Sequence, residues 1–242
     1  MNPMIQQLKE RKSVRVFQDK QIPAQEVTAI LEAAVNAPTA GNQQLYTIIN
    51  VTDPELKAQL AESCDHQPFI AQAPLVLVFC ADCRKWYQAF SAYGCEPRNP
   101  GVGDLMLAVS DANIAAQNAV VAAHSLGLGS CYIGDIMENA EQQRKLLSLP
   151  PYVFPAAMLV FGYPTAEQLE RAKPPRCEMH HIVHENGYRD MDAQELQDML
   201  SVKTGVRAFE DWIQAFCNRK YNSDFSREMT RSVGVFLEDF QK

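Results

Sequence analysis

The chain has 242 residues, of which 47% are apolar and 21% are charged, an ordinary globular balance that argues against disorder. At ~150 residues per domain, this length suits one domain with an extension, or two small domains. A net charge of −7 argues against binding nucleic acid through its phosphates, and seven cysteines in a chain of this size suit reduced thiols better than a disulfide-stapled domain.

Neither a membrane span nor an export signal is visible. The longest unbroken apolar run is the seven residues from Leu75 to Ala81, far short of the ~20 needed to cross a bilayer. The N-terminal segment MNPMIQQLKERK is polar and lacks the apolar core of a signal peptide. We therefore expect a cytoplasmic protein that has neither a membrane nor a nucleic acid as partner.

Apolar periodicity and capping residues predict an alternating series of helices and strands. In chain order these are a helix at 4–10, a helix at 24–36, a strand at 45–51, a helix at 53–63, a strand at 75–81, a helix at 104–126, a strand at 131–133, a helix at 139–147 and a strand at 156–161. The strands 75–81 and 156–161 are apolar at every position, which suits burial between helical layers. The helix at 104–126 is apolar on nearly all sides, as in a core helix or an oligomer interface. The pattern predicts an α/β or α+β layered domain.

Two basic clusters lie far apart in the sequence. Because the chain is acidic overall, two such clusters suit an anion bound between them, and a phosphate monoester matches both Arg and Lys. The alternative interpretation is a set of solvated surface charges. The first cluster contains Arg11, Lys12, Ser13 and Arg15, and the second contains Lys173 and Arg176.

Two loop segments could contact a ligand. Pro38–Gln44 is crowded with small and amide side chains that offer donors and acceptors, although a plain helix-to-strand connection explains it equally. Gly127–Asp135 carries a glycine at the end of a predicted strand, where a ring could approach closely, or where only a turn is needed. Neither segment matches a GxGxxG or GxxxxGK[ST] nucleotide motif.

The cysteines and histidines suggest no strong metal or nucleophile site. Cys80 and Cys83 form one CxxC pair, which could be a redox pair, part of a zinc site with His180 and His184, or two incidental buried thiols. A GxSxG nucleophile elbow and an HExxH motif are both missing from the sequence. This lack of an obvious side-chain catalyst favours a binding protein, or an enzyme whose cofactor performs the chemistry.

Taken in order, several segments resemble the FMN-dependent nitroreductase and flavin reductase family, closest to its oxygen-insensitive NADPH nitroreductases. The resemblance covers roughly residues 1–190, and the order and spacing of the motifs carry it. The matching segments are Glu10–Phe17, Ala37–Gln44, Gln67, Ala71–Pro74, Ala115–Ala119, Ser125–Gly129, Tyr132–Gly134, Lys173–Arg176 and Val183–Glu185.

The resemblance implies an α+β fold, a three-layer sandwich with a mixed central sheet flanked by helices, assembled as an intertwined homodimer. Residues 1–190 would form the FMN-binding domain, and residues 191–242 a helical extension packed on it. The long helix at 104–126 would form much of the dimer interface, so we expect a bulky residue at Ala116 to disturb dimerisation.

The resemblance also implies how the flavin is held. A positive charge at Arg15 would lie near the N1–C2 carbonyl edge of the ring, where it stabilises the anionic reduced flavin. The phosphate and ribityl clamp would comprise Arg11, Lys12 and Ser13, completed by Lys173 and Arg176. Around the ring would lie Gln67, Ile133, Gly134 and Asp135, together with Thr39, Gly41 and Asn42 from the other subunit.

The sequence departs from the family pattern in three places. Pro175 interrupts the usual Lys-Pro-Arg clamp, and Asp135 stands where the related proteins tend to carry a second glycine. From Asp192 onward the similarity is faint, and this is the region that binds the 2′-phosphate of NADPH in the family. Arg219 and Lys220 are the local candidates, with Lys203 and Arg207 behind them.

The implied function is an FMN oxidoreductase with ping-pong chemistry. NAD(P)H would pass a hydride to N5 of the flavin, and a planar acceptor such as a nitroaromatic, quinone, azo dye or free flavin would then take the electrons. No side chain need act as acid or base, and no metal is expected. The alternatives are a non-catalytic flavin- or phosphate-ligand-binding protein of the same fold, and a zinc-stabilised interaction module.

Overall fold

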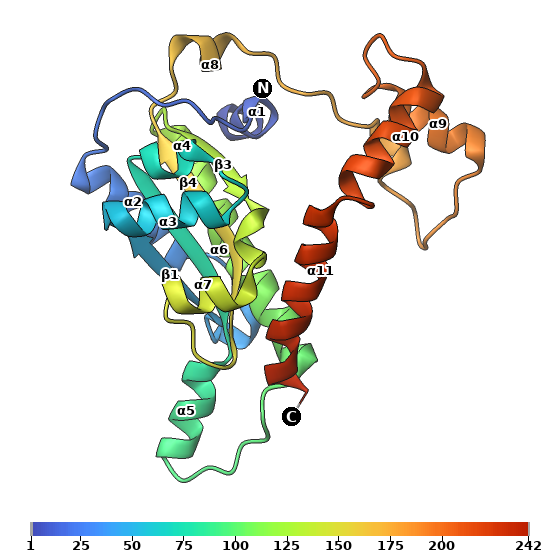
Figure 1. Cartoon of the computed structure of the whole chain (residues 1–242). Coiled ribbons are helices and arrows are strands. Elements are labelled where there is room, and N and C mark those ends of the chain that lie inside the picture. The colour runs from blue at the N-terminus through green and yellow to red at the C-terminus, as the bar shows by residue number, and fades with distance from the viewer. Residues whose placement is uncertain (1, 242) are drawn as a thin grey trace. The chain divides into compact units, whose positions relative to one another are not determined.

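The computed structural model describes residues 2–241, and its centre is a sheet of four strands (Figure 1). The strands are β1 (Tyr46–Val51), β2 (Leu75–Asp82), β3 (Gly129–Ile133) and β4 (Val153–Gly162), in the order β1-β2-β4-β3. All three pairings are antiparallel, so the mixed sheet that we expected is wrong. Every position of β2 and β4 is buried, but burial on both faces requires only helices on both sides and does not set strand direction.

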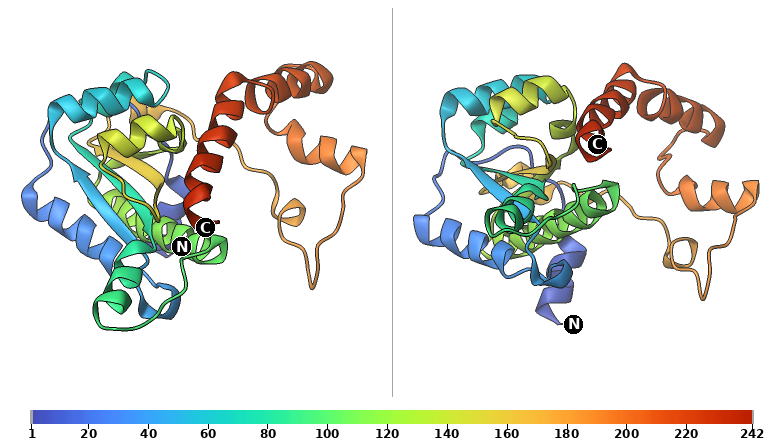
Figure 2. Two further views of the ribbon diagram at one scale, coloured as in Figure 1. Left: turned by 60° about the horizontal axis from the view of Figure 1, so that its bottom comes forward. Right: turned by 90° about the horizontal axis from the view of Figure 1, so that it is seen from below.

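Helices cover both faces of the sheet, which makes the three layers of an α+β sandwich (Figure 2). One face carries α2 (Ala24–Val35) and α6 (Val102–Ser125), and the other carries α3 (Pro54–Ser63) and α7 (Ala140–Leu146). The predicted start of α3 is confirmed, because the Asp53 carboxylate accepts the Glu55 N–H at 2.9 Å.

The long helix α6 crosses the whole sheet. It has the length and mean hydropathy of a membrane-spanning helix, but much of it is buried in this fold against α2 and the strands. Ala116 has no exposed surface within the single chain. A bulky residue there would therefore disrupt the core of the chain itself, and the prediction that it reports on dimerisation is wrong.

The chain forms two compact units. The first unit runs to Arg171 and resumes at Glu228, and the second is Ala172–Arg227. The boundary that we expected after residue 190 falls inside the second unit. The remaining helices, in chain order, are α1 (Pro3–Glu10), α4 (Pro68–Gln72), α5 (Arg84–Ala92), α8 (Ala166–Glu170), α9 (Ala193–Ser201), α10 (Phe209–Lys220) and α11 (Asp224–Leu237).

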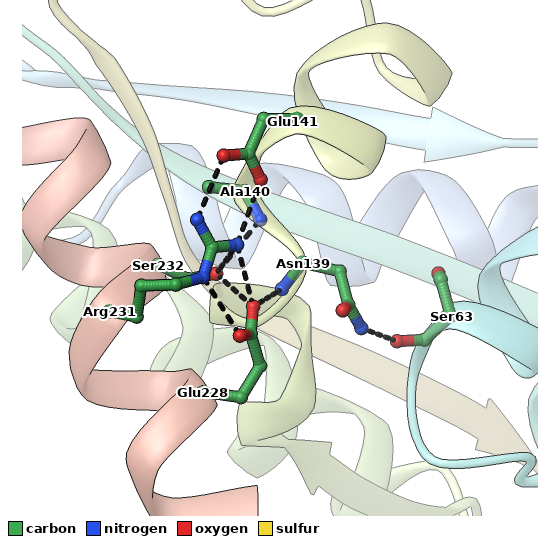
Figure 3. Close-up of polar contacts among 7 residues, drawn as sticks. All are labelled: Ser63, Asn139, Ala140, Glu141, Glu228, Arg231 and Ser232. Atoms are coloured by element: carbon green, nitrogen blue, oxygen red, sulfur yellow. Dashed lines mark hydrogen bonds and ion pairs between the residues drawn. The ribbon is translucent and has the colours of Figure 1, made fainter.

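From Glu228 onward, α11 belongs to the first unit and caps α7 (Figure 3). Asn139 stands at the start of α7, but its side chain makes no capping bond and donates instead to the Ser63 carbonyl at 2.9 Å. Glu228 accepts the Asn139 N–H at 3.2 Å, and Ser232 accepts the Ala140 N–H at 2.9 Å. The free N–H groups of α7 are thus satisfied by a helix about 90 residues later in the chain.

The same surface carries an ion-pair network. Arg231 forms a two-pronged pair with Glu141 at 2.8 and 2.9 Å and also binds Glu228 at 2.8 Å (Figure 3). These bonds lower the pKa of Glu141 and of Glu228 to about 2. The network joins the C-terminal part of the chain to the core.

Candidate functional site

The first basic cluster is held against the start of β3. Ser13 and Ser130 form a parallel bridge, and the Val14 N–H donates to the Ser130 carbonyl at 2.9 Å. The backbones approach so closely that a Cβ at Gly129 would lie 2.6 Å from Val14 Cβ. Only glycine at position 129 permits this contact, which fixes the Arg11–Arg15 segment beside the strand.

The cations of this segment have different surroundings. Arg11 Nη2 lies 3.5 Å from Ser130 Oγ, and the guanidinium lies 5.8 Å from the Tyr132 ring centroid. The Arg15 guanidinium lies 6.0 Å from the centroid of Phe69 in α4. Arg11 also borders a cavity of about 130 Å³ beside Gly129 and Ser130. These arginines could therefore present positive charge to an anion at this edge of the sheet.

Lys12 differs from its neighbours. Its Nζ donates to the Leu169 carbonyl at 2.7 Å and to the Arg171 carbonyl, at the C-terminal end of α8. Arg171 in turn donates to the Ser13 carbonyl, a contact that the sequence analysis missed. In this structure Lys12 therefore ties α8 to the N-terminal segment.

Cys131 lies beside the same segment and is buried. Burial raises the pKa of its thiol, while the nearby Arg15, Ser13 and Arg11 oppose that rise. The Cys131 side chain is therefore in contact with the cluster.

The end of β3 opens into a short turn that leaves room for a ligand. Gly134 is exposed, and a Cβ built on it meets nothing within 4 Å among the described residues. Asp135 lies close enough to Cys64 to raise its pKa, which burial brings to about 12. Gln67 also contacts this residue, because its Nε2 donates to the Cys64 carbonyl at 2.8 Å. The structure thus brings the turn after Ile133 and the Gln67 amide to one region.

The loop before β1 is fixed by a buried acid that the sequence analysis missed. Asp111 in α6 is 2% exposed and accepts hydrogen bonds from the Thr39 hydroxyl, from Ala40 N at 2.9 Å and from Leu45 N at 3.2 Å. A carboxylate in the middle of an apolar helix was the available signal. The loop residues Gly41 and Asn42 remain exposed.

One chain does not bring this loop to the β3 cluster. The loop leads into β1, and the Arg11–Arg15 segment lies on β3, at opposite edges of the sheet. Three inter-strand spacings separate these edges, roughly 14 Å at ~4.8 Å each. A ligand confined to the β3 cluster would therefore lie across the sheet from Thr39, Gly41 and Asn42 of the same chain.

The other predicted cations lie in the second unit. Arg176 Nη1 donates to the Pro174 carbonyl at 2.9 Å, and Lys173 belongs to the same segment. The Arg219 guanidinium lies 5.2 Å from the Phe216 ring, and Lys220 Nζ lies 5.8 Å from the Phe225 ring. A cavity of about 260 Å³ here is lined by Arg207, Trp212, Ala215, Phe216 and Arg219.

The zinc hypothesis has no geometric support. Across residues 2–241, no group of three or more His, Cys, Asp or Glu side chains is arranged to hold a metal ion. Cys80 and Cys83 are both buried, and burial raises the pKa of each thiol to about 12. Both behave as small apolar side chains of the core.

A second buried acid lies behind the turn after β3. Glu138 is 6% exposed, and its Oε1 has no hydrogen-bond partner among the described residues. Burial, reinforced by Asp135, Asp65 and Glu228, raises its pKa to about 7. The sequence offered no signal for this, because the neighbouring carboxylates come from three separate segments.

Comparisons with known proteins give a consistent family. The Nitroreductase family model matches residues 8–163. The chain is 32% identical over 241 residues to FMN reductase [NAD(P)H] of Bacillus subtilis, covering 98% of this chain and 92% of that protein. It is 35% identical over 197 residues to the oxygen-insensitive NADPH nitroreductase of Salmonella typhimurium, covering 81% and 79%. The solved structure of B. megaterium NfrA2 superposes with a TM-score of 0.84, at 31% identity over 99% of this chain and 98% of that one.

Proposed function

Because the chain belongs to the Nitroreductase family, we propose that it is an NAD(P)H-dependent FMN oxidoreductase. When bound, FMN takes up a hydride from NAD(P)H and delivers electrons to a planar acceptor such as a nitroaromatic, a quinone or free flavin. The observation that carries the proposal is the fit of the β3 edge to this cofactor. There, Arg11 and Arg15 lie beside β3, and the strand ends in a turn with open space around Gly134.

The residues of this edge bind and orient the cofactor. Arg11 and Ser13 would contact the phosphate and ribityl chain. Lys173 and Arg176, which the resemblance implies as further phosphate ligands, belong to the second unit. Arg15 stabilises negative charge on the ring, since a fixed cation there needs no reorganisation during the reaction. Gln67 offers a side-chain amide to the ring or ribityl, and the exposed backbone of Gly134 lets the ring approach. Asp135 adds a carboxylate beside it.

The working unit is a homodimer. The separation of the Thr39–Asn42 loop from the β3 cluster supports a site that a second copy of the chain completes. Apolar side chains exposed on α1 and α6 offer a surface for it, among them Met4 at 61%, Met106 at 61% and Ile114 at 40% exposure. Ile114→Glu should give a monomer with weakened flavin binding, measured by light scattering and absorbance. A dimer of unchanged mass would contradict this interface.

The pyridine nucleotide uses the second unit. Arg219 and Arg207 offer positive charge beside the stacked rings of Trp212 and Phe216, whose centroids are 5.0 Å apart, and Lys220 follows Arg219 in the chain. This combination suits the adenine and phosphates of NAD(P)H. The reduced state of the seven cysteines, four of them buried, fits a cytoplasmic enzyme.

The test is a visible absorption spectrum of the purified protein, taken without oxygen before and after NADPH, then with NADH. We expect a yellow protein that bleaches with one or both donors. A yellow protein that stays oxidised would favour a non-catalytic flavin-binding protein. A colourless protein that takes up no added FMN would refute the proposal.

A further inference from the structure

A cavity separate from the β3 edge lies between α5 and the start of α6. Its volume is about 280 Å³, and its wall includes the rings of Trp86, Tyr87 and Phe90 with Leu107 opposite. No residue of α5 is fully buried, so this helix presents its aromatic face to the cavity without contributing a buried side chain to the core. The helix leads through a long loop into α6 (Figure 1).

The aromatic wall is held in place by polar contacts. The Trp86 indole N–H donates to the Gln43 carbonyl at 2.7 Å, and the Tyr87 hydroxyl lies 3.1 Å from Asn99 Oδ1. The rings of Trp86 and Phe90 pack with centroids 5.5 Å apart. A surface ordered in this way loses little side-chain entropy when a ligand binds.

The cavity carries no net charge. Its charged lining residues are Arg98 and Asp104, which form a two-pronged ion pair at 2.6 and 3.0 Å. The Asp104 carboxylate also accepts the Gly101 N–H at 2.8 Å. Cys83 in the wall is a neutral thiol, because burial raises its pKa to about 12. The only cation available to an anionic ligand is therefore Arg98, whose charge Asp104 already neutralises. An uncharged aromatic ligand instead gains apolar contact with the wall.

The position of the cavity connects it to the proposed reaction. Gln43 and Leu45 in its wall belong to the loop fixed by Asp111, which the proposed dimer brings to the flavin of the second copy. Its volume also suits a small aromatic molecule, since ~150 Å³ is enough for benzene. We propose that this cavity binds the ring of an uncharged aromatic acceptor, a quinone or nitroaromatic, in preference to anionic acceptors such as free FMN. This inference rests on the proposed function.

Fluorescence provides a direct binding test, because the chain has two tryptophans and Trp86 is the one in this cavity. The Trp212→Phe holoenzyme is titrated with 1,4-naphthoquinone in the absence of NAD(P)H. We expect saturable quenching of Trp86. The Trp86→Phe holoenzyme, which retains only Trp212, should show no saturable component. Equal quenching in both variants, or none in either, would overturn the proposal.

Kinetics provide the specificity test. Phe90→Ala should raise KM for naphthoquinone roughly tenfold, a loss of ~1.4 kcal/mol, and leave KM for free FMN unchanged. The matched control is Tyr93→Ala, which removes a ring that is 89% exposed just after the same helix. Equal KM increases for the quinone and for FMN would refute the charge argument. A change of oligomeric mass in Phe90→Ala would show instead that this face is a subunit contact.

Failure of this inference is distinguishable from failure of the proposed function. Rapid mixing of the variants with NAD(P)H without acceptor measures reduction of the bound flavin alone. If the flavin is reduced normally but Trp86 shows no saturable quenching, the proposed acceptor site is rejected and the oxidoreductase function is retained. Loss of reduction in the unaltered protein would reject the oxidoreductase itself.

Discussion

Replacing Asp111 with alanine should release the loop before β1 and destabilise the protein. The carboxylate accepts two backbone N–H groups, from Ala40 and Leu45, and the Thr39 hydroxyl. Its removal leaves both backbone donors without their acceptor in a site that is 2% exposed at Asp111. At ~1–3 kcal/mol for each such donor, the loss in the free energy of unfolding is about 2–6 kcal/mol.

That loss is a large part of the ~5–15 kcal/mol that stabilises a typical domain. Urea unfolding, followed by circular dichroism, should therefore show a clear fall in midpoint. Hydrogen exchange should show earlier exchange of the amides of Ala40 and Leu45 than in the unaltered protein. In the proposed dimer the freed loop also leaves the flavin of the second copy, so a weaker hold on FMN accompanies the fall in stability.

The adjacent position supplies a matched control. Ser110 is exposed, and its hydroxyl bonds only to the Met106 carbonyl of its own helix. Ser110→Ala should keep the unfolding midpoint and the loop protection. An Asp111→Ala variant with the stability of Ser110→Ala would refute the view that this carboxylate fixes the loop.

Three further substitutions test other parts of the first unit. Glu138 carries a pKa raised to about 7, so the folded state holds its proton to higher pH than the unfolded state, and this contribution to stability is lost as pH rises from about 4.5 through 7. In Glu138→Gln, the thermal midpoint should therefore fall less as the pH is raised across this range. Ser232→Ala removes the acceptor of the Ala140 N–H and should lower the free energy of unfolding, measured in urea, by about 1–2 kcal/mol. Gly129→Ala places a Cβ 2.6 Å from Val14 Cβ, so it should separate the bridged segments and reduce the FMN retained on purification, measured by absorbance.

Each of these three substitutions has a control variant that leaves the tested contact intact. Glu32→Gln alters an exposed glutamate, and the pH dependence should persist. Ser125→Ala removes a hydroxyl that bonds only within its own helix region, and Gly103→Ala adds a Cβ that meets nothing within 4 Å among the described residues. A variant that behaves as its control would contradict the corresponding contact.

The sequence predicted the layers of the fold but not the direction of its strands. The apolar run from Leu75 and the helix capped by Asp53 are local patterns, and the structure confirms both. Strand direction depends on which strands pair, and no local pattern states that β2 pairs with both β1 and β4. Ala116 illustrates the same limit of local patterns, because an apolar helix face can pack equally well against a second subunit or inside the core of its own chain.

The candidate site was predictable where it rests on consecutive residues. Arg11, Ser13 and Arg15 form one segment, and the structure places it beside β3. The roles of Lys12 and Asp111 depend on backbone partners about 70 to 160 residues away, so no spacing rule reveals them. The aromatic cavity at α5 was also missed, because its wall combines a helix, two loops and the start of α6.

The capping of α7 by residues of α11 has a consequence for the order in which the protein folds during synthesis. The last strand of the sheet ends at Gly162, so all four strands emerge from the ribosome before Glu228 and Ser232 are translated. Until then, the first turn of α7 lacks the acceptors that its N–H groups use in the finished molecule. Domains generally fold from the N-terminus as they are made. The nascent chain therefore carries a nearly complete sandwich in which the start of α7 stays frayed until Glu228 and Ser232 have been made.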